Sequence, residues 1–150
     1  MGRLVYPLLL IFFAAPLSYY DFKYNRIPNL LSLGSWLSGL VVSFFLKELP
    51  LQNYLLGSAM ALISYLLIYL LSSKKLGWGD IKLSLFLGGI GGWAGWLITN
   101  FIASLTGIIY YLLIVRLGKS DIKTPIPFAP FLCLGALLYQ ALSLTGWDLF

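Results

Sequence analysis

The sequence predicts an all-α, polytopic membrane helix bundle, built as a single integral-membrane domain over residues 1–150. Three observations carry this prediction. Hydrophobic residues make up 60% of the chain and charged residues only 10%, and the mean hydropathy is +0.90, so apolar residues far outnumber the interior positions of a soluble domain. They gather into segments near the roughly 20 residues that cross a bilayer, and the basic residues concentrate in alternate loops.

Six apolar segments are expected to be transmembrane helices. The fourth and fifth run together, so we expect an uncharged turn between them near Trp93–Trp96, where indole rings suit a membrane interface. Small residues spaced four apart, such as Gly88 and Gly92, are expected to let a neighbouring helix pack closely. The six segments are Leu4–Tyr20, Leu30–Leu46, Tyr54–Leu71, Leu83–Trp96, Leu97–Val115 and Phe128–Leu144.

The basic residues predict how the bundle is oriented in the membrane. If the loops after the first, third and fifth segments face the cytoplasm, only Arg3 and Lys47 lie outside, as the positive-inside rule prefers. This topology describes a multi-pass protein of the cytoplasmic membrane with both termini outside. Residues 1–20 also permit a reading as a cleavable signal peptide, although the run is longer than a usual signal segment. The net charge of +5 is scattered over short loops, so we expect no nucleic-acid partner.

Two carboxylates from distant parts of the chain are expected to meet at the cytoplasmic face. Asp21 follows the first segment and precedes Ile27-Pro28-Asn29, where Pro28 limits how far the helix continues. Asp80 lies in Gly77-Trp78-Gly79-Asp80-Ile81-Lys82-Leu83, at the mouth of the fourth segment. An ionisable group at a membrane boundary is a functional-site candidate. Two that lie close together share a proton, so one becomes a base and the other an acid.

A carboxylate pair activates water against an amide carbonyl without a metal ion, an organic cofactor or a covalent intermediate. The chain has no histidine, which excludes His-Glu-x-x-His zinc proteases and Ser-His or Cys-His dyads. The single Cys133 lies in an apolar run and is expected to be a small buried residue. A Ser-Lys hydrolase using Ser72, Ser73 and Lys74 stays formally possible, but these residues are typical of a solvated loop.

Helix dipoles give a first assignment of the two roles. Asp80 begins a helix, where free N–H groups favour the ionised form, so we expect it to be the base toward water. Asp21 ends a helix, where the dipole favours the neutral acid. Lys82 either steers this ionisation or extends to the interface as a topology marker. The other acidic residues are expected to be solvated or on the opposite face: Glu48, Asp121 and Asp148.

Taken together, these motifs resemble the type IV prepilin peptidase family of GxGD aspartic proteases. The resemblance rests on Asp21 before Ile27-Pro28-Asn29, on Gly77–Leu83, and on Pro125-Ile126-Pro127-Phe128-Ala129-Pro130-Phe131 last in order, and it covers nearly the whole chain. It implies that the catalytic aspartates are Asp21 and Asp80. Residues expected to support the site are Gly77, Gly79, Lys82, Pro28 and Asn29.

The resemblance also implies a reaction and a substrate. A member of this family cleaves the short basic leader of a prepilin or pseudopilin, on the cytoplasmic side of the bilayer and usually after a glycine. Many bacterial members carry an additional N-terminal region with two Cys-x-x-Cys pairs for N-methylation, whereas this chain has one cysteine. We therefore expect a peptidase without the methyltransferase part. No motif indicates an oligomeric state.

Two other classes of function use similar residues. A non-catalytic transport or assembly subunit would use the paired aspartates as a proton or cation site. Presenilin-like intramembrane proteases share the GxGD pattern but place the partner motif within a helix core, whereas we expect Asp21 to belong to the loop with Ile27-Pro28-Asn29.

Overall fold

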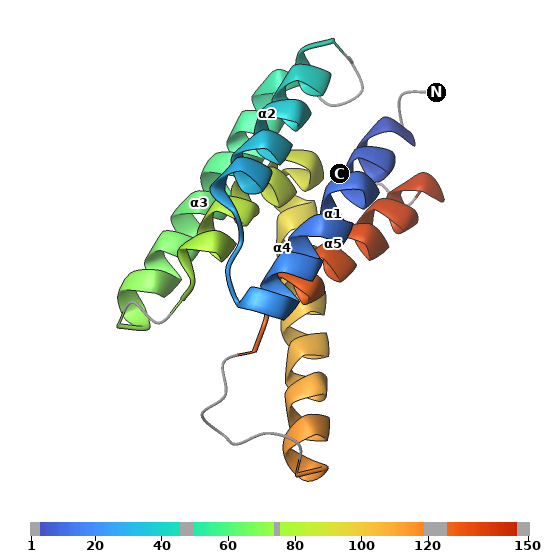
Figure 1. Ribbon diagram of the computed structural model, residues 1–150. Helices are drawn as coiled ribbons and strands as arrows, with labels where there is room; N and C mark the ends of the chain where they lie inside the picture. Colours follow the sequence, from blue (N-terminus) through green and yellow to red (C-terminus); the bar gives the residue numbers. More distant parts are fainter. Residues whose placement is uncertain (1–3, 46–49, 74–75, 119–125, 147–150) are drawn as a thin grey trace.

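The computed structural model describes residues 4–45, 50–73, 76–118 and 126–146, and the regular structure of these residues is helical (Figure 1). Among them, α1, α3 and α4 are long and apolar enough to cross a membrane, and α2 and α5 are shorter apolar helices. The chain is an all-α membrane protein, which confirms the predicted fold class. The elements are α1 (Val5–Tyr24), α2 (Asn29–Phe45), α3 (Leu51–Leu71), α4 (Trp78–Arg116) and α5 (Ala129–Leu144).

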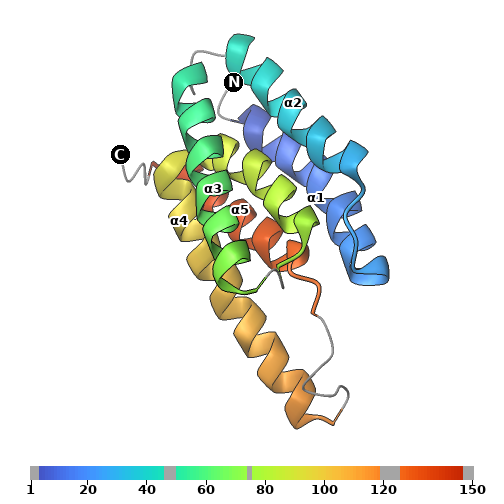
Figure 2. The same ribbon diagram turned by 90° about the vertical axis from the view of Figure 1, so that its left-hand side faces the viewer.

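The expected count of six helices is not confirmed, because the fourth and fifth segments lie in the single element α4 of 39 residues. Gly92 inside it is non-helical, with φ 63° and ψ −171°, a conformation open essentially to glycine alone. The chain turns back on itself there, so α4 forms two arms (Figures 1 and 2). The uncharged turn expected near Trp93–Trp96 therefore falls at the adjacent Gly92, and Trp93–Trp96 themselves are helical.

Two helix boundaries differ from the expected ones in a way that matters for the carboxylates. Helix α1 continues past Tyr20 to Tyr24 and ends where Asn25 adopts a left-handed conformation and donates its N–H to the Asp21 carbonyl at 2.8 Å. Helix α4 begins at Trp78 instead of Leu83. Asp21 therefore ends a helix, as the dipole argument expects, and does not belong to the loop with Ile27-Pro28-Asn29. Both aspartates lie in helices, one in a last turn and one in a first turn.

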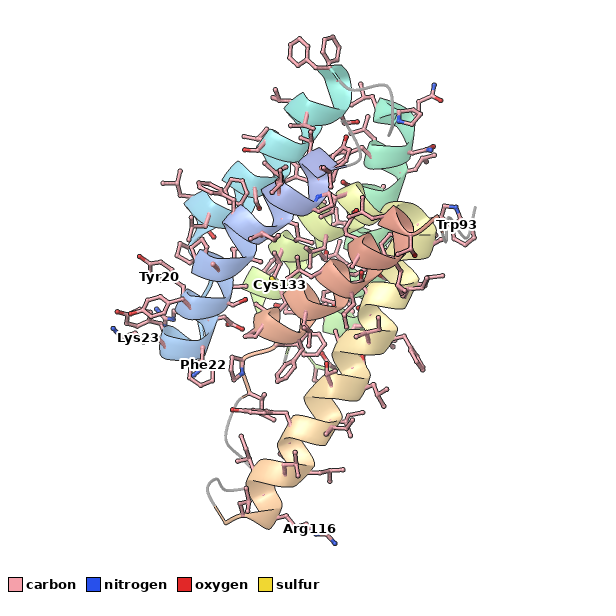
Figure 3. The ribbon with its side chains drawn as sticks, turned by 90° about the vertical axis from the view of Figure 1, so that its right-hand side faces the viewer. Tyr20, Phe22, Lys23, Trp93, Arg116 and Cys133 are labelled. Carbon is pink, nitrogen blue, oxygen red and sulfur yellow. The ribbon has the colours of Figure 1, made fainter. Side chains whose placement is uncertain are left out.

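The direction of the helices brings those two turns to one end of the bundle. Helices α1 and α3 and the second arm of α4 end toward it, and α2, α4 and α5 begin there (Figures 1 and 2). Figure 3 shows Lys23 and Arg116 toward this end, and Trp93 at the opposite end of the second arm of α4. The two aspartates therefore share one end, as the alternation of segments predicts.

Small residues and a few polar contacts join the helices. Gly57 of α3 lies directly against Gly88 of α4, and a Cβ on either residue would collide with the other's backbone, which confirms the packing role expected for Gly88. The Ser58 hydroxyl donates to the Leu85 carbonyl at 2.8 Å, and the Gln140 amide donates to the Ile90 carbonyl at 3.0 Å. Lipid gives apolar helices no preference for one another, so close approach and such polar contacts stabilise the bundle.

Candidate active site

Asp21 is a buried carboxylate that the start of another helix orients. Its Oδ2 accepts a hydrogen bond from the backbone N–H of Ala129, the first residue of α5, at 2.9 Å. The residue before it, Phe128, forms no side-chain cap hydrogen bond, so Asp21 caps α5 from a distance of 108 residues along the chain. Free N–H groups and the dipole at a helix N-terminus stabilise negative charge. The start of α5 therefore fixes Asp21 and favours its carboxylate form.

Asp80 has different surroundings at the start of α4. Its Oδ1 is buried and has no hydrogen-bond partner among the described residues. Its Oδ2 lies over Gly77, where an added Cβ would be 3.3 Å from this oxygen. A buried carboxylate oxygen without a donor is unfavourable in the charged form. This oxygen is suited to bind a proton or to accept a hydrogen bond from a ligand.

The two carboxylates lie near enough to interact electrostatically. Cys133 of α5 lies within electrostatic reach of both of them, and Tyr65 of α3 within reach of Asp80. Four helices therefore converge on the pair. Like charges placed in this way favour one shared proton, which makes one carboxyl group a base and the other an acid.

The two motifs that carry the carboxylates are in direct contact. Gly79 packs on Ile27, whose Cβ would be 2.9 Å from a Cβ at position 79, so a side chain there would separate the two segments. The Lys82 ammonium donates a hydrogen bond to the Asn29 side-chain oxygen at 2.6 Å. Lys82 thus links the start of α4 to the start of α2. A lysine that only extended to the membrane interface would not need this contact.

The remaining predicted residues have structural positions that follow from the backbone. The carbonyl of Pro28 accepts the N–H groups of Leu31 and Ser32 at 3.1 and 3.2 Å and thereby opens α2. Gly77 precedes the first turn of α4 and leaves space for the Asp80 side chain. Both residues therefore shape the site through the backbone.

Sequence reasoning did not identify the Ala129 N–H, Ser18 or Tyr65 as parts of this region. A backbone donor cannot be recognised from the type of its side chain. The prolines of Pro125–Phe131 indicate a helix start, and this was the feature of the sequence that could have pointed to a free N–H there. Cys133 is buried, as expected, but its hydrogen-bonding partner Ser18 of α1 was not foreseen. Such partners are set by tertiary packing between α1 and α5.

Several residues weighed in the sequence lie outside the described part of the chain: Glu48, Lys74, Asp121 and Asp148. Lys74 is the base of the Ser-Lys alternative, so that alternative stays untested. In residues 4–45, 50–73, 76–118 and 126–146, no group of three or more His, Cys, Asp or Glu side chains is placed as a metal site requires.

Two carboxylates that approach each other from separate helices, at one end of an apolar bundle, define a membrane protein with a candidate acid–base pair. The chain belongs to the type IV leader peptidase family, whose sequence profile matches residues 8–112.

Curated relatives agree with this assignment. The chain is 32% identical to a prepilin leader peptidase/N-methyltransferase of Legionella pneumophila over 97% of its own length and 53% of the relative's. It is also 32% identical to the protein of that name from Pseudomonas aeruginosa, over 85% of this chain and 46% of the relative. A third, from Aeromonas salmonicida, is 31% identical over 95% of this chain and 51% of the relative. No solved structure matches the chain significantly.

The chain spans about half the length of the curated relatives that it matches. Their shared name covers two activities, a leader peptidase and an N-methyltransferase. The expectation that this chain has the first activity without the second stays a prediction.

Proposed function

We propose that the protein is a membrane aspartic endopeptidase that removes the short basic leader of a prepilin or pilin-like protein. The observation that carries this proposal is that Asp21, in the last turn of α1, and Asp80, in the first turn of α4, lie near enough to interact electrostatically. Membership of the leader peptidase family and the names of the relatives support the substrate class. The aspartic mechanism rests on the carboxylate pair.

In the proposed mechanism Asp21 is the base and Asp80 the acid. The Ala129 N–H and the dipole of α5 favour the carboxylate form of Asp21, whereas no donor in the described part of the chain reaches the buried Oδ1 of Asp80. This assignment reverses the one that the dipoles of the two aspartates' own helices predict, because α5, a third helix, acts directly on Asp21. A dyad titrates as a unit, so the assignment describes the resting pair.

The reaction then balances in two steps. Asp21 takes a proton from a water molecule as the water oxygen attacks the scissile carbonyl carbon, and Asp80 donates its proton to the carbonyl oxygen. The tetrahedral intermediate collapses when its hydroxyl proton returns to Asp80 and Asp21 passes its proton to the leaving amine. The C–N bond breaks, and the pair regains its starting protonation state.

The membrane location fits this substrate. A prepilin has an apolar helix in the bilayer and a basic leader in the cytoplasm, so its scissile bond lies at the depth of a boundary site. We place the protein in the cytoplasmic membrane, with both termini outside and the carboxylates at the cytoplasmic face, as the distribution of basic residues favours. A helical amide is shielded by its own hydrogen bonds, so a glycine at the junction assists unwinding.

The test is cleavage of a synthetic prepilin with a basic leader and a glycine junction by the purified protein in detergent. Asp21→Asn and Asp80→Asn should each lower the rate by about a hundredfold or more, the usual contribution of general acid–base catalysis. Asp148→Asn, expected on the opposite face, is the matched control and should retain full activity. If wild type leaves the precursor intact, or either site variant cleaves it normally, the proposal fails and the transport alternative takes its place.

A further inference from the structure

A groove runs along the surface between α1 and α5. It has a volume of about 310 Å³, and side chains from both helices line it. From α1 these include Ile11, Ala14, Ala15 and Ser18, and from α5 they include Cys133 and Leu134. No charged residue is among the lining side chains.

The groove is collinear with the candidate active site. On α1, Ile11, Ala14, Ser18 and Asp21 are spaced three or four residues apart and therefore lie along one face. On α5 the first lining residue is Pro130, which follows Ala129, the residue whose N–H donates a hydrogen bond to Asp21. Both walls of the groove thus lead to the same carboxylate.

Cys133 marks the junction between the groove and the carboxylate pair. It lies on the side of α5 that faces α1 (Figure 3), where it is a hydrogen-bonding partner of Ser18 and within electrostatic reach of Asp21 and Asp80. The one polar side chain on the α1 wall, Ser18, therefore has its partner inside the protein. The groove therefore presents an apolar surface to a molecule that binds in it.

The groove faces the surroundings of the bundle, so its occupant comes from the membrane. Ile11 is 54% exposed and Leu134 is 42% exposed at its sides, and in a membrane protein these side chains meet the hydrocarbon. The small residues Ala14 and Ala15 allow a second helix to approach the backbone of α1 closely. A helix is about 10–12 Å across, so a groove of this volume receives the side chains of one helix face.

We propose that the groove between α1 and α5 binds one face of the substrate's apolar transmembrane helix and thereby presents the peptide just before that helix to Asp21 and Asp80. This inference rests on the proposed function. We favour a substrate helix over a lipid acyl chain as the occupant because the groove leads to the carboxylates. Only a molecule that is cleaved needs to bind next to them. From Ser18 to Ile11 the α1 wall extends roughly 10 Å at 1.5 Å per residue, so about two turns of the substrate helix lie in the groove.

The first arm of the test is photocrosslinking to the synthetic prepilin described above. Benzoylphenylalanine is placed at Leu134, in the groove, or at Met60 of α3, which is similarly exposed at 47%. The proposal predicts crosslinks from position 134 and none above background from position 60. An excess of unlabelled precursor should compete for the crosslink, whereas a peptide with the leader and junction but no apolar helix should not. Equal crosslinking at both positions, or competition by the helix-free peptide, would overturn the proposal.

The second arm compares two alanines that are both exposed. Ala15→Trp fills the groove and should raise KM for the full precursor about tenfold or more, the signature of lost substrate binding. Ala59→Trp on α3 should leave KM within about twofold of wild type. If both variants cleave with the same KM, the groove proposal fails while the peptidase stands. If wild type and Ala59→Trp cleave no precursor, the proposed function fails, and the groove proposal fails with it.

Discussion

Asp21 and Asp80 reach the same place by different means. Asp21 comes from the last turn of α1 and is fixed by a donor from the first turn of α5, so tertiary structure supplies its hydrogen bond. Asp80 comes from the first turn of α4 and has a buried oxygen without a partner among the described residues. Glycines shape its surroundings, because Gly77 leaves space for its carboxylate and Gly79 lets the Ile27 segment approach.

This difference shows how one site keeps two carboxyl groups in different states. A carboxylate with an N–H donor at a helix start is stabilised as an anion, and one with an unsatisfied buried oxygen is suited to a proton. The same difference makes the two aspartates unequal in their contribution to folding. Substitutions that remove the donor, the glycines or the link between the motifs should therefore have separable effects.

The largest effect on the site's geometry should come from Gly79→Ala. The added Cβ would lie 2.9 Å from the Ile27 Cβ, and overpacking of this kind costs about 1–3 kcal/mol of unfolding free energy. It should also displace Asp80 and remove most of the cleavage activity. The measurement is denaturant unfolding in detergent together with the cleavage assay.

Gly34→Ala is the matched control, because no atom of the described residues lies within 4 Å of a Cβ at that position in α2. It should leave stability unchanged or raise it slightly, as alanine favours a helix over glycine. If Gly79→Ala behaves like Gly34→Ala, the close approach of the two motifs is not what the site requires.

A second prediction separates the two carboxylates by stability. Asp21→Ala leaves the Ala129 N–H without its acceptor, which should lower the unfolding free energy by about 1–2 kcal/mol. Asp80→Ala removes a side chain whose Oδ1 has no hydrogen-bond partner among the described residues, so the unfolding free energy of this variant should be unchanged or higher. Thermal unfolding in detergent measures both, and both variants should be inactive. Equal destabilisation by the two substitutions would contradict the difference in hydrogen bonding.

The smallest expected effect concerns the hydrogen bond from Lys82 to Asn29. It lies at an exposed position, and exposed charged contacts contribute about 0.2–1 kcal/mol. Lys82→Met and Asn29→Ala should each lower activity modestly, and the double variant should be no worse than either alone. Additive losses in this double-mutant cycle would show that the two side chains act separately.

Much of the fold follows from the sequence, because apolar runs and alternating charged loops determine which segments become helices and which ends coincide. Where α1 ends does not follow, since Pro28 permits several stopping points and Asn25 makes the actual one. The turn within α4 depends on one glycine among several. Gly92 adopts the non-helical conformation, whereas Gly88 packs against α3.

For the site, sequence reasoning places the two aspartates at one end but misses what distinguishes them. Their own helices predict that Asp80 is the charged partner, whereas the donor on Asp21 comes from α5, far away in the chain. A backbone N–H of Ala129 leaves no trace in a side-chain pattern. Contacts of this kind are set by the packing of α1 on α5.

The measurement that most directly tests the account is the cleavage rate of the synthetic prepilin by Asp21→Asn, Asp80→Asn and the variant carrying both. Residues that act as one catalytic unit are strongly non-additive. The account predicts that the double variant is no slower than the slower of the two single variants, all three remaining folded. Multiplied losses in the double variant, or normal cleavage by either single variant, would contradict a shared two-carboxylate mechanism.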